Sequence, residues 1–94
     1  MNNLIVLNQN DNVGVSQFII PEKTKIEGHD ISTIDPIPFV HKVSLKSINK
    51  EDPIIKYDQI IGFALNDIKP GEHVHSHNLE FREFKRDFKV TDKK

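Results

Sequence analysis

Apolar residues along the chain are grouped mostly in short, β-branched runs of the kind that form strands. The first run, residues 4–7 (LIVL), is closed by the turn-forming residues 8–12 (NQNDN). The next run, residues 13–20 (VGVSQFII), carries apolar side chains on both faces and predicts a largely buried strand. Two prolines within residues 31–39 (ISTIDPIPF) exclude a helix or a central strand there. The pattern therefore predicts a mainly β domain.

The middle of the chain contains an internal repeat. When residues 41–58 are shifted by 20 positions, they align with residues 61–78 in both their apolar positions and their turns. The matched apolar pairs are Val43 with Phe63, Leu45 with Leu65, Ile48 with Ile68 and Ile54 with Val74. Each copy is expected to contain a strand, a short helical turn, a β-turn and a second strand. Two copies are too few for an extended array, so we expect them to form a compact, pseudo-symmetric β structure.

Helical spacing occurs only at the end of the chain. Phe81, Phe84 and Phe88 lie at positions i, i+3 and i+7, on one face of a helix. Basic residues are interleaved with them, but acidic residues argue against stacking on nucleic acid. We therefore expect one domain over residues 1–80 and a C-terminal helical arm or linker over residues 81–94, packed on its own domain or on a partner.

Composition narrows the classes of function. The chain has 94 residues, enough for one modest core, and a formal charge of −1, which gives no reason to expect nucleic acid or an anionic membrane as a partner. It has no cysteine, which excludes disulfides, thiolate metal sites and cysteine nucleophiles. The N-terminus lacks signal-peptide features, and no stretch approaches the roughly 20 apolar residues that cross a bilayer. These features predict a soluble, cytoplasmic domain.

Three of the five histidines lie in residues 71–78 (GEHVHSHN). Because Val74 is expected to be buried, alternation along a strand places His73, His75 and His77 on the opposite face. Residues two apart on a strand have Cα atoms about 6.6 Å apart, so His75 can share an ion with either neighbour, whereas His73 and His77, about 13 Å apart, can do so only across a bend. Two histidines with ligands from elsewhere form a reasonable Zn, Fe or Mn site. The alternative is an exposed strand end without function.

The motifs in residues 37–45 (IPFVHKVSL) and 54–78 (IIKYDQIIGFALNDIKPGEHVHSHN) resemble a known family. They are similar to the N-terminal SAF-type β-clip domain of the altronate/galactarate dehydratases. In that family the module is fused ahead of a larger catalytic domain or made as a separate small subunit, and a similar small subunit occurs in sulfolactate sulfo-lyases. The N-terminal third of the chain fits the pattern only loosely. The resemblance implies a compact β-clip fold.

Two positions depart from the family pattern. Val40 and Asp58 replace glycines, which usually mark a positive φ or a close approach of the backbone. Asp58 can be accommodated in the left-handed region, whereas a β-branched valine is disfavoured there. The loop before His41 is therefore the one expected to differ, together with the role that the resemblance implies for His41.

The resemblance implies a role for several residues. His41 is implied as the acid–base group, because histidine titrates near neutral pH. Ammonium, hydroxyl and amide groups suit a carboxylate substrate, and the implied substrate-binding residues are Lys42, Lys56, Tyr57 and Asn78. The implied metal ligands are His75 and His77, for an Fe(II) ion or alternatively Mn(II) or Zn(II), shared with the large partner. His73 and His29 are interpreted as surface residues.

The implied reaction is the dehydration of a hydroxy acid such as altronate or galactarate, with sulfolactate as a further candidate substrate. A base removes the proton next to the carboxylate, and a metal polarises the carboxylate and the departing hydroxyl. The chain offers no complete catalytic constellation, so we predict part of a carbon–oxygen lyase, inactive without a larger catalytic domain or subunit. The alternatives are a non-catalytic SAF-type carbohydrate-binding or chaperone-like module and, more weakly, a metal buffer. Exposed strand edges favour homo-oligomers.

Overall fold

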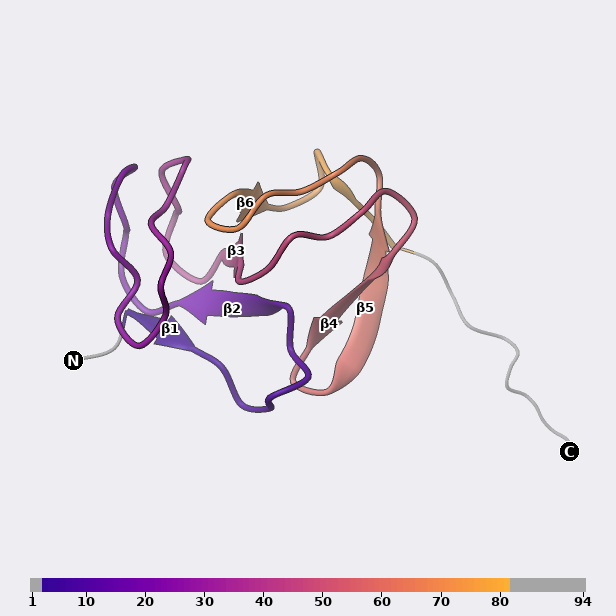
Figure 1. Cartoon of the computed structure of the whole chain (residues 1–94), viewed down its shortest axis with the longest axis horizontal. Helices are drawn as coiled ribbons and strands as arrows, with labels where there is room; N and C mark the ends of the chain where they lie inside the picture. Colours follow the sequence, from indigo (N-terminus) through magenta and orange to yellow (C-terminus); the bar gives the residue numbers. More distant parts are fainter. Residues whose placement is uncertain (1–2, 82–94) are drawn as a thin grey trace, which may run out of the picture.

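The computed structural model describes residues 3–81 and contains two small antiparallel sheets (Figure 1). The first sheet has the order β1-β2-β3-β6, with β1 at Leu4–Ile5, β2 at Val13–Ser16, β3 at Lys42–Ser44 and β6 at His73–Val74. The second has the order β4-β5-β7, with β4 at Pro53–Lys56, β5 at Gln59–Ala64 and β7 at Leu79–Glu80. The mainly β class is thus confirmed.

No helix is found within residues 3–81, so the short helical turns expected in each repeat copy are absent there. The same residues contain no helix that is long and apolar enough to span a membrane. Except for the exposed Phe81, the predicted C-terminal arm lies outside the described residues. The predicted strand over residues 13–20 is wrong in its second half. It ends at Ser16, because the chain then bends, and Phe18 and Ile19 are 48% and 75% exposed.

The internal repeat is present in the structure. After β3 and after β5 the chain makes a bend, an isolated β-bridge and a tight turn in the same order. The bridge residues Ile48 and Ile68 pair with each other through two backbone hydrogen bonds, of 2.9 and 2.7 Å. Their side chains lie in one buried cluster together with Ile54 and Val74. The two copies therefore meet as an antiparallel pair, in keeping with the compact, pseudo-symmetric β structure expected from the repeat.

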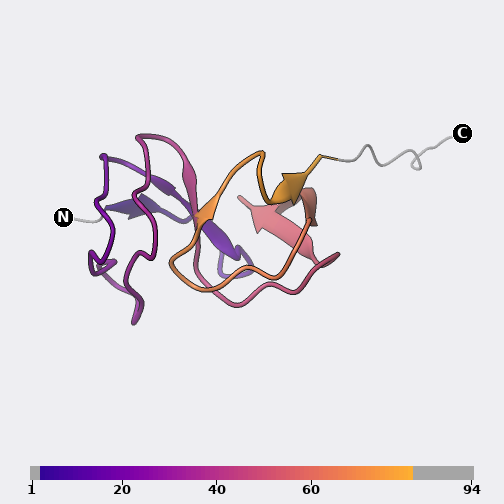
Figure 2. The same ribbon diagram turned by 90° about the horizontal axis from the view of Figure 1, so that it is seen from above.

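A second pair of such turn units, not detected in the sequence, forms the N-terminal half. Residues 17–24 and 34–41 show the same order of bend, bridge and turn. Their bridge residues, Ile20 and Ile37, exchange backbone hydrogen bonds of 2.9 and 2.7 Å and belong to a separate buried cluster. Figures 1 and 2 place this pair at the N-terminal end of the molecule and the first pair at the other end. The domain thus contains four similar turn units in two pairs.

Each turn unit places its seventh residue in the left-handed region of backbone conformation. These residues are Lys23 (φ 60°), Val40 (φ 59°), Glu51 (φ 75°) and Gly71 (φ 87°). The N–H groups at these positions donate to carbonyls next to the paired unit, as from Val40 to Ser16 at 3.1 Å and from Gly71 to Ser44 at 2.8 Å. Pairing of the units therefore stabilises the positive φ.

The two residues that replace family glycines both have a positive φ. Val40 adopts the left-handed conformation although valine is disfavoured there, so the loop before His41 keeps the geometry of the other three units. Asp58 (φ 62°) is in the left-handed region, as its residue type allows. With Tyr57 (φ 55°) it forms the two-residue turn between β4 and β5, and two positive φ values are characteristic of a type I′ hairpin.

Replacement of Val40 by glycine is expected to stabilise the domain. The side chain is 60% exposed, so little packing is lost, whereas the left-handed conformation is unfavourable by about 1–2 kcal/mol for a residue with a Cβ. Glycine increases the entropy of the unfolded chain, which offsets part of this gain. We expect the unfolding free energy to rise by about 0.5–1 kcal/mol in urea denaturation. Glu51→Gly, at the equivalent position, should gain less stability because glutamate is not β-branched. A lower free energy of unfolding in Val40→Gly would contradict this account.

Candidate metal and substrate site

Imidazole rings from two distant segments of the chain converge beside β3 and β6. His41 immediately precedes β3, and His73 begins β6, which pairs with β3 so that Val43 lies opposite His73. One ring nitrogen from each of His41, His73 and His75 lies within 4.8 Å of the other two. His41 Nδ1 is 2.9 Å from His73 Nε2, and the ring centroids are 4.2, 5.1 and 5.7 Å apart. We call these three side chains the histidine cluster.

The chain turns after His75, so His77 does not continue the strand. The N–H groups of Asn78 and Leu79 both donate to the His75 carbonyl, at 3.1 and 2.9 Å. This bend brings the rings of His77 and His73 to a centroid distance of 5.3 Å, although an extended strand would keep them apart. His77 is not in the group of three converging nitrogens, whereas His73, interpreted from the sequence as a surface residue, is. The assignment of His77 as a metal ligand stays a prediction.

The surroundings of His73 and His75 favour the neutral form of these two imidazoles. Desolvation by burial lowers the pKa of His73 below its ordinary value, and the neighbouring imidazoles lower it further, while Asp35 acts in the opposite direction. Desolvation also lowers the pKa of His75, with further contributions from His41 and Lys42. Metals bind the neutral form of imidazole. The cluster is therefore suited to metal binding near neutral pH.

Lys42 lies near the cluster, and Lys56 lies near Lys42. Burial lowers the pKa of Lys42, and the charge of Lys56 lowers it further, which places the two ammonium groups within electrostatic reach of each other. Lys42 also acts on His75, and Lys56 Nζ lies 5.2 Å from the centroid of the Tyr57 ring, within the range of a cation–π contact. Of the predicted substrate-binding residues, Lys42 thus lies close enough to His75 to affect its pKa, and Lys56 lies close to both Lys42 and Tyr57.

Asn78 has no exposed surface and contacts the backbone of residues 73–75, which we call the histidine segment. Its Oδ1 accepts the N–H of His75 at 2.9 Å, and its Nδ2 donates to the carbonyl of His73 at 2.9 Å. A third, longer contact of 3.4 Å runs from Nδ2 to Glu72 Oε2. The side chain is therefore engaged within the chain at both of its polar atoms.

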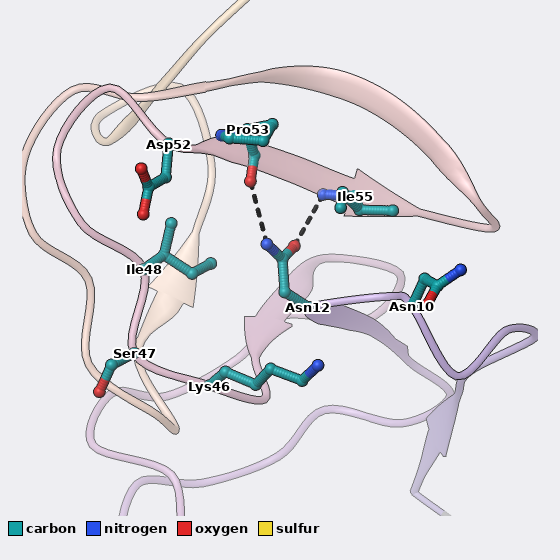
Figure 3. A pocket seen from close by; sticks show the side chains of 8 residues that line it. All are labelled: Asn10, Asn12, Lys46, Ser47, Ile48, Asp52, Pro53 and Ile55. Atoms are coloured by element: carbon teal, nitrogen blue, oxygen red, sulfur yellow. Dashed lines mark hydrogen bonds between the residues drawn. The ribbon is translucent and has the colours of Figure 1, made fainter.

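A cavity of about 230 Å³ lies apart from the cluster, between β4, the segment before β2 and the turn unit at residues 45–52 (Figure 3). Lys46 and Asp52 line it, and no histidine does. Asn12 also lines it, but its side chain is already bonded to the backbone of β4. This cavity is therefore lined by none of the candidate site residues predicted from the sequence.

The fold and the site define a class: a small β domain that carries three converging imidazoles with a lysine nearby, groups that are suited to binding a metal ion and an anion. The comparison with known families specifies it further. Residues 2–82 match the family model of the altronate/galactarate dehydratase SAF domain, and the chain belongs to that family. The resemblance seen in the sequence is thereby confirmed, and it extends over the N-terminal third as well.

Three relatives illustrate how much of each protein the chain covers. The chain is 36% identical over 82 residues to "Altronate dehydratase" of Bacillus subtilis (strain 168), which is 85% of this chain and 16% of that protein. The Escherichia coli (strain K12) "Altronate dehydratase" is 37% identical over 70 residues, or 14% of its length. The "(2R)-sulfolactate sulfo-lyase subunit alpha" of Chromohalobacter salexigens is 39% identical over 46 residues, 49% of each chain. The chain therefore matches a small part of the dehydratases and about half of the sulfo-lyase subunit.

Proposed function

We propose that this chain is the small subunit or N-terminal module of a hydro-lyase that dehydrates a sugar acid of the altronate or galactarate type. The observation that carries the proposal is the convergence of His41, His73 and His75, with Lys42 near His75 and Lys56 near Lys42. Membership of the altronate/galactarate dehydratase SAF family supports the reaction class. The paired turn units support a β-clip architecture.

The donor set of the cluster fits a divalent transition metal. Three imidazole nitrogens can bind one ion and leave further positions open, as in catalytic three-histidine sites, and imidazole suits Fe(II), Mn(II) and Zn(II). We propose His41, His73 and His75 as the ligands, in place of the pair His75 and His77. When bound, such an ion would polarise the substrate carboxylate and the departing hydroxyl group.

The lysines and the tyrosine of this chain would hold the substrate. The ammonium groups of Lys42 and Lys56 attract a carboxylate, and the Tyr57 hydroxyl offers a hydrogen bond. These contacts would orient the acid beside the cluster, which lowers the entropic part of the barrier. With His41 assigned to the metal, the base that removes the proton would come from the partner.

A larger catalytic domain or subunit would complete the site. The dehydratases matched here extend far beyond the aligned region, and the sulfo-lyase relative is named as an alpha subunit, which supports such a partner. The experiment is to tag the chain, purify it anaerobically from its own host, and assay the complex on altronate, galactarate and sulfolactate. We expect activity in the complex only, reduced by His73→Ala without loss of the partner. An inactive chain that binds sugars without a partner would support a non-catalytic binding module instead.

A further inference from the structure

The Asn78 side chain holds the histidine segment on both sides of one residue. It contacts the carbonyl of His73 and the N–H of His75, each at 2.9 Å, and Val74 lies between them. The two hydrogen bonds therefore fix the backbone of Val74 and, through it, the separation of the two residues whose rings belong to the histidine cluster. Glu72 completes the arrangement, since its Oε2 faces Asn78 Nδ2 at 3.4 Å.

Asn12 makes the same pair of hydrogen bonds on the other copy of the internal repeat. Its Oδ1 accepts the N–H of Ile55 at 2.7 Å, and its Nδ2 donates to the carbonyl of Pro53 at 3.0 Å (Figure 3). Under the shift of 20 positions, Pro53 and Ile55 are the counterparts of the two histidines. Asn12 comes from the segment before β2, however, whereas Asn78 follows β6. The held segment carries Pro53 and Ile55 in one copy and two imidazoles in the other.

We propose that Asn78 is a positioning residue for the ligands His73 and His75 and not a contact to the substrate. This inference rests on the proposed metal site. A buried amide supplies one acceptor and one donor in a fixed geometry, which is what an N–H and a carbonyl on the same segment require. Substitution of residues that orient metal ligands typically lowers metal affinity by about ten- to a hundredfold.

The test compares Asn78→Ala with its matched control, Asn12→Ala. Co(II) is titrated into each full-length chain, with affinity and the visible absorption spectrum as readouts, at a temperature where circular dichroism shows all proteins folded. Each variant loses one hydrogen bond to a backbone N–H and one to a backbone carbonyl, and Asn78→Ala also loses the longer contact to Glu72, so we expect losses of thermal stability of the same order. Only Asn78→Ala should lower the Co(II) affinity, by about tenfold or more, and change the spectrum. Equal affinities in the two variants would overturn the inference, whereas a wild-type chain and complex that bind no Co(II) would overturn the proposed metal site itself.

A second pair of variants keeps the test valid if Asn78→Ala does not fold. Asn78→Asp retains the volume and the acceptor for His75, but its carboxylate faces the His73 carbonyl and the Glu72 carboxylate. We expect a loss of Co(II) affinity of about tenfold, partly restored by adding Glu72→Gln, whose amide can donate to the new carboxylate. If the double variant is folded and shows no recovery of affinity, the network does not position the ligands.

Discussion

Removal of any one imidazole of the histidine cluster is expected to lower the affinity for a divalent metal by about a hundredfold or more. His41→Ala, His73→Ala and His75→Ala each delete one of three nitrogens that lie within 4.8 Å of one another. Loss of a direct ligand should exceed the roughly ten- to hundredfold effect that is typical of groups that only orient ligands. The measurement is a titration with Zn(II) or Co(II), made on the chain alone and on its complex.

Two other histidines provide the controls for this prediction. His29 lies outside the cluster, so His29→Ala should bind metal as the wild type does. His77→Ala tests the assignment made from the sequence: its ring approaches His73, but it is not one of the three converging nitrogens, and we expect less than a tenfold effect. If His77→Ala loses as much affinity as His73→Ala, then His77 is a ligand and the bend after His75 brings it to the ion.

Replacement of Gly71 by alanine is expected to lower the free energy of unfolding by about 3 kcal/mol or more, the largest stability effect among the substitutions proposed. The residue has φ +87°, and a Cβ there would overlap the Ser32 carbonyl oxygen and lie 3.3 Å from Thr33 Cα. Both obstacles are backbone, which cannot move aside as a flexible side chain can. The Gly71 carbonyl also accepts the N–H of Ile34 at 2.8 Å, so the two segments are held together. The unfolding free energy from urea denaturation measures the effect.

Gly28 is the matched control for Gly71. It has nearly the same backbone conformation, φ +84°, but a Cβ there would meet nothing within 4 Å. Gly28→Ala should therefore lose only the conformational preference of glycine, about 1 kcal/mol. Similar losses in the two variants would show that the backbone around Gly71 relaxes. Because Gly71 lies two residues before His73, its substitution should also weaken metal binding by the cluster.

Local sequence patterns predicted those parts of the fold that depend on near neighbours. The β-branched runs indicated the mainly β class, and the repeat identified Ile48 and Ile68 as equivalent positions, whereas their pairing was seen only in the structure. The second pair of turn units was missed, because residues 17–24 and 34–41 share little more than an isoleucine followed by a proline. Their similarity lies in the backbone, where different residue types satisfy the same hydrogen bonds.

The sequence by itself determined the strand character of the chain, its family and the segments that carry candidate histidines. Only the tertiary structure decided which histidines meet. On an extended strand, His73 and His77 would lie far apart. In the structure the chain turns after His75, and Asn78 holds this turn by hydrogen bonds to the backbone of His75. His41 joins the cluster from 32 residues away through the pairing of β3 with β6. The spacing of residues encodes local geometry, but contacts between distant segments depend on strand register, which is fixed by packing of the whole domain.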